Sequence, residues 1–185
     1  MIKRIEGSFV EWCYQIITSD QYVFLDTETT GLGSSDQIIE IAVINAAGSA
    51  LCDGLLRPTY PIGKGAMAVH RITEEMVSKA PTFAEAWPDI ERVIDGRKII
   101  AWNAAFDARM IIQTAMASKI TLRNIDFYCA MRGYSEHYRL QKWAKLVEAC
   151  AHQGIDFQQD HRTIGDIRAT LEVIRAIARK AEVKM

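Results

Sequence analysis

The hydrophobic positions of this 185-residue chain follow two different periods, which predicts both helices and strands. Near the N-terminus, apolar residues recur at steps of three and four, the period of one helix face: Ile2, Ile5, Phe9, Trp12 and Ile16. Gly7 weakens the first half of this helix, which leaves Ser8 as an alternative start. Residues 18–20 end it.

A series of strands and helices is expected after residue 20. Tyr22–Leu25 is an unbroken apolar run that ends at Asp26, the pattern of a central strand covered on both faces. Further strands are expected over residues 37–45, 49–56, 97–101 and 125–129. Helices are expected over residues 73–78, 82–94, 104–118, 140–152 and 163–184, and a long loop over 57–71. Hairpin-connected strands followed by strands alternating with helices predict an α/β fold with a mixed five-stranded sheet and helices on both faces.

Composition excludes several classes of protein. Hydrophobic residues make up 49% of the chain and charged residues 24%, which is ordinary globular usage and argues against a disordered or fibrous protein. Lysine plus arginine number 22 against 23 acids, so the chain is not a strongly basic nucleic-acid binder, although a local basic groove stays open. The sequence shows no membrane-spanning run and no signal peptide, and its four cysteines are scattered. A cytoplasmic protein with reduced thiols and no membrane association is expected.

Two acids end the first apolar strand. Asp26 and Glu28 are two residues apart, so a strand would point both side chains to one face. Two carboxylates beside an apolar run are costly to bury unless they are paired or bind a metal. Alternatively, the strand ends at Leu25 and both acids are solvated.

Two further acids and a histidine occupy helix starts. Asp107 follows the expected N-cap Asn103 by four residues, and interaction with the helix dipole, worth about 0.3–1 kcal/mol, is its alternative role. Asp166 follows Thr163 by three residues and could be the acid of a capping box. His161 and Asp166 can face one site only if the histidine lies in the loop before the helix and the acid in its first turn. An exposed loop histidine is the alternative.

The acids and the histidine fall in three motifs that follow one another along the chain: Phe24–Leu32 (FLDTETTGL), Asn103–Asp107 (NAAFD) and His161–Asp166 (HRTIGD). Their combination favours a shared functional site over separate structural roles. A weaker motif is VHRITEE at residues 69–75. With this order and spacing the sequence resembles the DEDDh, or DnaQ-like, 3′–5′ exonucleases, which include proofreading subunits and RNase T. The resemblance implies an RNase-H-like fold, with a helical extension over residues 1–19 and an exonuclease domain over 20–185.

The resemblance also implies a two-metal centre. Asp26, Glu28, Asp107 and Asp166 would gather around two Mg²⁺ or Mn²⁺ ions, for which hard oxygen ligands are suited. Two ions about 3.5–4 Å apart can stabilise both the attacking water and the leaving 3′-oxygen. His161 would be the general base, because histidine exchanges protons near neutral pH.

Five residues match substrate-binding positions of the family. Leu32 would pack on the terminal base, and His70 would approach the terminal nucleotide unless it bonds to the backbone instead. Thr27 would contribute a backbone amide or its hydroxyl. Asn103 is a helix cap first and a substrate contact second, and Phe106 fits a stacking surface and the core equally well.

Basic and aromatic residues interleave further along the chain: Arg132, Arg139, Lys142 and Lys145 with Tyr134, Tyr138 and Trp143. Aromatic stacking with a cationic track is how proteins hold single strands without reading their sequence. The alternative, which the helical pattern favours, is a solvated helix face over a packed Trp143.

The resemblance to DEDDh exonucleases therefore implies a hydrolase that removes nucleoside 5′-monophosphates from the 3′ end of single-stranded nucleic acid. DNA is the expected substrate, because the DTETTGL form of the first motif resembles that of proofreading and processing DNA enzymes more than that of oligoribonucleases. The alternatives are an exoribonuclease using the same site and a catalytically idle module that binds nucleic acid or a polymerase. A single strand with a free 3′ end is the expected partner, and a homodimer or an association with a polymerase is compatible with the sequence.

Overall fold

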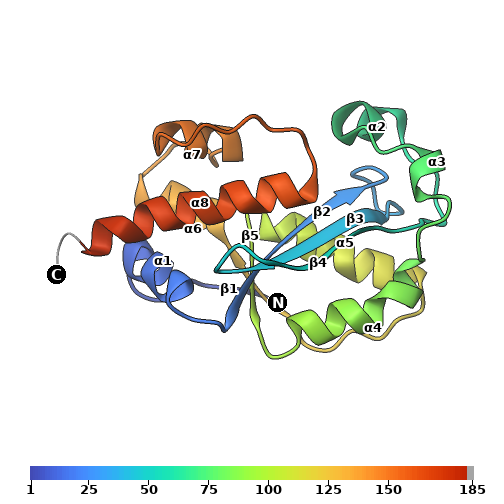
Figure 1. Cartoon of the computed structure of the whole chain (residues 1–185), viewed down its shortest axis with the longest axis horizontal. Helices are drawn as coiled ribbons and strands as arrows, with labels where there is room; N and C mark the ends of the chain where they lie inside the picture. Colours follow the sequence, from blue (N-terminus) through green and yellow to red (C-terminus); the bar gives the residue numbers. More distant parts are fainter. Residues whose placement is uncertain (183–185) are drawn as a thin grey trace.

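The structure, a computed structural model, describes residues 1–182 as a mixed sheet between two layers of helices (Figure 1). The strands are β1 (Ile2–Lys3), β2 (Tyr22–Thr29), β3 (Ile38–Asn45), β4 (Ala50–Leu55), β5 (Lys98–Ala101) and β6 (Asp126–Cys129). The helices are α1 (Phe9–Ile17), α2 (Lys64–His70), α3 (Glu74–Val77), α4 (Phe83–Ile94), α5 (Ala104–Ala117), α6 (Ala130–His137), α7 (Leu146–His152) and α8 (Thr163–Glu182). In the sheet order β1-β6-β5-β2-β3-β4, the first four strands are parallel and β2, β3 and β4 are antiparallel. The expected mixed sheet with helices on both faces is confirmed.

The sheet has six strands rather than the five expected, because Ile2–Lys3 pairs with the outer edge of β6. A helix over residues 2–16 is therefore wrong, and the alternative start after Ser8 is correct. The Ser8 hydroxyl accepts a hydrogen bond from the Glu11 amide, and the Glu11 carboxylate accepts one from the Ser8 amide. This capping box fixes the helix start and leaves the preceding residues free to extend the sheet.

Two helices occur where none was expected. α2 lies inside the expected loop 57–71, and α6 lies between β6 and the expected helix 140–152. That last helix is shorter than expected and begins only at Leu146. α6 packs closely on the N-terminal segment, since a Cβ at Gly133 would come within 2.6 Å of atoms in Ile5 and Phe9. α8 begins at Thr163 as expected, and its expected end at residue 184 lies outside the described residues.

Side chains of the central strand β2 alternate between two hydrophobic cores. Tyr22 and Phe24 belong to the core beneath α1, α6, α7 and α8. Val23 and Leu25 belong to the core beneath α4 and α5. All four are buried, as the unbroken apolar run predicts for a strand with helices on both faces. Within residues 1–182, no helix is long and apolar enough to cross a bilayer.

Candidate active site

The central strand continues beyond its apolar run and carries the first two acids. β2 pairs with β3 as far as Thr29, so the alternative in which the strand ends at Leu25 is wrong. Because Asp26 and Glu28 continue the series of Phe24, they point toward the α8 layer, and Thr27 points toward α5. Neither acid is freely solvated, and both are only partly exposed.

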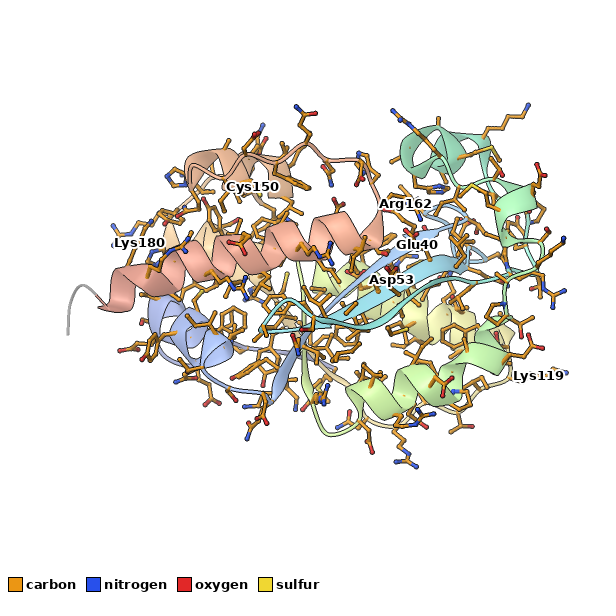
Figure 2. The ribbon with its side chains drawn as sticks, viewed as in Figure 1. Glu40, Asp53, Lys119, Cys150, Arg162 and Lys180 are labelled. Atoms are coloured by element: carbon orange, nitrogen blue, oxygen red, sulfur yellow. The ribbon has the colours of Figure 1, made fainter. Side chains whose placement is uncertain are left out.

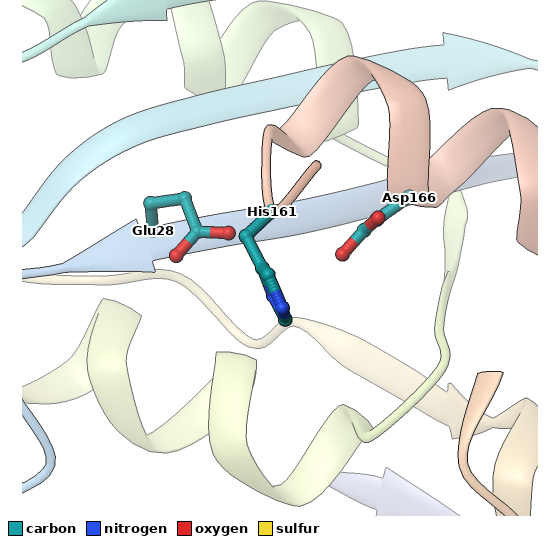
Figure 3. A group of neighbouring side chains, drawn as sticks. All are labelled: Glu28, His161 and Asp166. Carbon is teal, nitrogen blue, oxygen red and sulfur yellow. The ribbon is translucent and has the colours of Figure 1, made fainter. Parts of the chain in front are cut away.

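The start of α8 brings a histidine and a third acid to Glu28. His161 lies in the loop before α8 with φ of 53°, and Asp166 lies in the first turn. One ligand atom each from Glu28, His161 and Asp166 lies within 4.8 Å of the other two (Figure 3). This is the loop-and-first-turn arrangement that their five-residue spacing requires.

Asp166 is not the acid of a capping box. The Thr163 hydroxyl, which would be the cap, is buried without a hydrogen-bond partner among the described residues. Asp166 Oδ2 instead accepts a hydrogen bond of 2.8 Å from Gln159 Nε2, and Asp166 Oδ1 is buried with no partner there. A buried carboxylate oxygen left without a donor is typical of a site that receives a cation or substrate.

The fourth acid lies on the opposite helix layer. Asp107 is in the first turn of α5 and is only 2% exposed. Thr27 Oγ1 donates a 2.9 Å hydrogen bond to Asp107 Oδ1, which links β2 directly to α5. Burial raises the pKa of Asp107 to about 7, and the hydrogen bond from Thr27 opposes this rise. Such burial does not fit the alternative of a surface acid held by the helix dipole.

Asp26 lies at the electrostatic centre of the group. Burial raises its pKa well above the usual range for aspartate, and neighbouring negative charges raise it further. The charges that act on it are those of Asp107, Asp166, Glu28 and Glu40, in decreasing order. The acids expected from three separate motifs are therefore close enough to repel one another.

The repulsion has little compensation from the chain itself. Burial, followed by the charges of Asp166 and Glu40, raises the pKa of Glu28 to about 8, while Arg162 acts in the opposite direction. Within residues 1–180, no lysine or arginine forms a salt bridge with Asp26, Glu28, Asp107 or Asp166. A cluster of carboxylate oxygens without a countercharge fits hard divalent cations such as Mg²⁺ or Mn²⁺.

A fifth acid, Glu40, was missed by the sequence analysis. It lies opposite Glu28 in the β2–β3 register and is 2% exposed. Arg162 Nε donates to both carboxylate oxygens, at 2.9 and 3.1 Å, and Arg162 Nη2 and the Thr163 amide also donate to them. Figure 2 shows Glu40 and Arg162 beside the first turn of α8. The signal was available, because a single acid inside the apolar run IIEIAVI must find a partner when buried.

Leu32 is held on an ordered turn at the end of β2 and is 76% exposed. Asp36 accepts hydrogen bonds from the Thr30 hydroxyl and the Gly33 amide. Gly31 lies so close that a Cβ there would be 2.7 Å from the Asp36 carboxylate, so a larger residue would displace the side chain that holds the turn. An exposed leucine on an ordered turn can contact a ligand without rearrangement.

Unlike Leu32, the expected substrate contacts His70 and Phe106 are at least partly buried in the protein, and Asn103 is exposed at the start of α5. His70 is 2% exposed, its Nδ1 accepts from the Ile72 amide at 2.9 Å, and its Nε2 lies 3.2 Å from the Thr29 carbonyl oxygen. This geometry favours the backbone-bonding alternative. Asn103 occupies the N-cap position of α5, yet its side chain is exposed and makes no capping hydrogen bond. Phe106 packs partly against the α4–α5 core, and the Arg109 guanidinium lies 5.4 Å from its ring centroid.

Comparison with known proteins identifies the family. The RNase_T family model, described as "Exonuclease", matches residues 23–174, a span that contains all three motifs and both helix layers of the site. The chain belongs to the DEDDh family of 3′–5′ exonucleases. The DEDDh assignment makes it a nuclease with an RNase-H-like fold.

Individual relatives of this DEDDh exonuclease cover most of its length. It is 36% identical over 173 residues to "Uncharacterized exonuclease CP81" of Escherichia phage 186, a match that covers 86% of this chain and 89% of that protein. It is 30% identical over 170 residues to "DNA polymerase III PolC-type" of Clostridium perfringens, covering 90% of this chain but only 12% of the polymerase. The solved structure "Exonuclease X in complex with 5′ overhanging duplex DNA" has a TM-score of 0.66 at 26% identity, covering 87% of this chain and 93% of that one.

Proposed function

We propose that this DEDDh exonuclease releases nucleoside 5′-monophosphates from the 3′ end of single-stranded DNA by a two-metal mechanism. The observation that carries the proposal is the convergence of Glu28, His161 and Asp166 within 4.8 Å, beside two further buried acids. Clustered acids without a salt-bridge partner are costly to the fold, whereas metal-dependent phosphodiester hydrolysis would use the four acids and the histidine.

The metal ligands in this proposal are Asp26, Glu28, Asp107 and Asp166. The unpartnered Oδ1 of Asp166 and the raised pKa values of the cluster support a site that is completed by cations. Bound divalent ions would supply the positive charge that allows a phosphodiester to enter and that stabilises the leaving oxygen.

His161 is the proposed general base. Its position in the loop directly before α8 places its ring beside Glu28 and Asp166, where it can accept the proton of the attacking water. Thr27 and Gln159 orient two of the carboxylates, since each donates a hydrogen bond to one oxygen and leaves the other available. Because a hydroxyl and an amide are uncharged, these hydrogen bonds do not neutralise the carboxylates, which can still bind cations.

The preference for DNA is supported by the relatives. The Exonuclease X structure contains DNA, and the PolC-type relative is a DNA polymerase that includes a segment similar to this chain. The PolC match also favours a polymerase as a protein partner. The site chemistry acts on the phosphodiester and is the same for RNA, so the substrate is decided by assay.

A substrate panel tests the proposal. Single-stranded DNA and RNA of one sequence, labelled at the 5′ end, are incubated with Mg²⁺, Mn²⁺ or excess chelator, and products are resolved by length. We expect a ladder shortened from the 3′ end on DNA with either metal, and none with chelator. Faster degradation of RNA would instead establish the exoribonuclease alternative.

Matched variants separate catalysis from binding. Asp166→Asn removes a proposed ligand, whereas Asp156→Asn removes an equal charge from an exposed position in the loop before α8. We expect the first to abolish the ladder and the second to leave it unchanged. Intact DNA with every metal, together with tight DNA binding, would show that the protein is a binding module.

A further inference from the structure

We propose that the loop between α6 and α7, residues 139–145, is an outer binding site for the single strand. In this site a base stacks on Trp143, and Arg139, Lys142 and Lys145 contact backbone phosphates. The inference rests on the proposed function, because it names how the substrate is held beyond the nucleotide being removed.

Trp143 is unlike the other tryptophans of the protein. It is 58% exposed, whereas Trp12, Trp87 and Trp102 are between 3% and 9% exposed. The sequence expectation of a packed Trp143 is therefore wrong. The inward residue of this segment is instead Ala144, which is 4% exposed. The exposed face of the indole ring is therefore available to stack on a ligand.

Hydrogen bonds to the core fix the backbone of the loop on both sides of Trp143. The Ala144 amide donates to Ser135 Oγ at 3.0 Å, and its carbonyl accepts from Trp102 Nε1 at 3.1 Å. The Leu140 amide donates to the Ser135 carbonyl at 2.9 Å. With Ala144 anchored on both backbone groups, the neighbouring side chain of Trp143 faces outward. A backbone that is already ordered reduces the entropy lost when a base stacks on the ring that it carries.

The anchor of the loop adjoins the acid cluster. Trp102 directly follows β5, which pairs with β2 in the register Phe24 to Ile100. Two residues further along each strand, the same parallel register places Trp102 beside Asp26, and both residues lie on the same face of the sheet as Phe24. The loop that carries Trp143 is thus attached one strand away from the acids, and a strand leaving the site can reach it.

The charge of the loop suits phosphate. Residues 139–145 contain three cations and no acid, in a chain whose net charge is −1. Arg139, Lys142 and Lys145 are exposed, and none of them forms a salt bridge within residues 1–180. Exposed cations beside an aromatic ring are the combination that binds single strands without reading sequence.

The site is smaller than the track considered from the sequence. Arg132 is paired with Glu136 at 2.8 Å, and Tyr134 is 1% exposed in the core. Tyr138 is partly buried against His152 and receives a hydrogen bond from Lys180. Arg132 is therefore engaged in a surface ion pair, and Tyr134 and Tyr138 in packing, so the proposed contact is limited to the loop.

Length dependence of hydrolysis tests the site. For wild type we compare kcat/KM on a 20-nucleotide strand and on a dinucleotide, which is too short to reach the loop. We expect Trp143→Ala to lower the ratio of kcat/KM on the long strand to kcat/KM on the dinucleotide about 10-fold, within the range of base–aromatic stacking. The double variant Lys142→Ala with Lys145→Ala, which removes two phosphate contacts, should lower the same ratio by about the same factor. Trp143→Phe, which retains a ring, should restore most of the ratio, and Tyr60→Ala, at an exposed aromatic 48% accessible elsewhere, should leave it unchanged.

Binding measured in chelator, where no hydrolysis is expected, tests the loop site separately from the proposed exonuclease activity. In chelator, oligo(dT) should quench the tryptophan fluorescence of wild type, and this quenching should be absent in Trp143→Phe because the other indoles are buried. Unchanged ratios and unchanged quenching in these variants would overturn the loop site while leaving the exonuclease proposal intact. Equal quenching by poly(glutamate) of matched charge would assign the loop to an acidic protein surface and would also overturn it. Failure of wild type to hydrolyse any strand would refute the function alone, since the quenching still decides the loop.

Discussion

Arg162 and Glu40 form a partly buried, multiply hydrogen-bonded ion pair that joins the start of α8 to strand β3. Arg162 Nε lies 2.9 and 3.1 Å from the two carboxylate oxygens of Glu40. Arg162 directly follows His161 in the chain, and Glu40 is opposite Glu28 in the sheet register. The pair therefore fixes the distance between the proposed base and a proposed metal ligand.

Removing the cation of this pair should weaken both stability and catalysis. Arg162→Met leaves the Glu40 carboxylate buried beside Glu28 without its countercharge, and an unpaired buried charge is strongly destabilising. Because Arg162 is itself 39% exposed in its side chain, we expect a loss of about 1–3 kcal/mol in the free energy of unfolding, with kcat at least 10-fold lower. Chemical denaturation and steady-state kinetics measure the two effects.

A double-mutant cycle provides the control for Arg162. Adding Glu40→Gln to Arg162→Met removes the stranded charge, so part of the lost stability should return. The turnover should stay low, because the segment that carries His161 still lacks the Arg162 side-chain hydrogen bonds to β3. Full recovery of kcat in the double variant would show that the pair has no positioning role.

The hydroxyl of Thr27 should strengthen metal binding. Thr27→Val removes the hydrogen bond to Asp107, which opposes the rise of the Asp107 pKa. We therefore expect the pKa of Asp107 to rise further and the Mn²⁺ dissociation constant at pH 7 to increase about 10-fold, as for loss of a hydrogen bond to a charged group. Isothermal titration calorimetry measures this, and Thr27→Ser, which retains the hydroxyl, should bind nearly as wild type.

Neutralising Asp26 should abolish turnover and stabilise the metal-free protein. Burial and four neighbouring negative charges make its ionised form costly in the fold. Asp26→Asn removes that cost, and each 1 kcal/mol gained should raise Tm by about 2–4 °C for a chain of this size. Thermal unfolding in chelator measures the shift. A clear fall in Tm would contradict the proposal that the acids are held together against their mutual repulsion.

The metal-free protein should lose stability as pH rises from about 4 to about 8. The pKa of Asp107 is raised from 3.8 to about 7 and that of Glu28 from 4.5 to about 8, so the folded state holds more protons than the unfolded state across this window. Stability contributed by these protonated acids is fully present below about pH 4 and is lost as the pH passes about 7 to 8. Thermal unfolding at several pH values in chelator measures the slope, and saturating Mn²⁺ should flatten it.

Leu32 should contribute to substrate binding and not to stability. Its side chain is 76% exposed on a turn held by Asp36, so Leu32→Ala removes few packing contacts. We expect Tm to change by less than about 2 °C, with a several-fold higher KM on single-stranded DNA. An unchanged KM would remove Leu32 from the substrate site.

The sequence by itself determined the local parts of this protein. An unbroken apolar run located β2, and helix-start signals located α5 and α8. The two-residue spacing of Asp26 and Glu28 predicted that both side chains lie on one face of the strand. The five-residue spacing from His161 to Asp166 required a loop followed by a first helical turn, which is what the structure has. These features depend on neighbouring residues only, and such short-range geometry is encoded in periodicity and helix starts.

Tertiary structure decided the features that depend on distant partners. Glu40 and Arg162 are 122 residues apart, and only packing of α8 on the sheet shows that the buried acid is paired. In the same way, Ile2–Lys3 became a strand because the edge of β6 was open to it, and Trp143 faces outward because Ala144 is anchored by Ser135 and Trp102. A local pattern specifies how a segment folds, whereas its contacts are set by the distant segments that the packed fold brings against it.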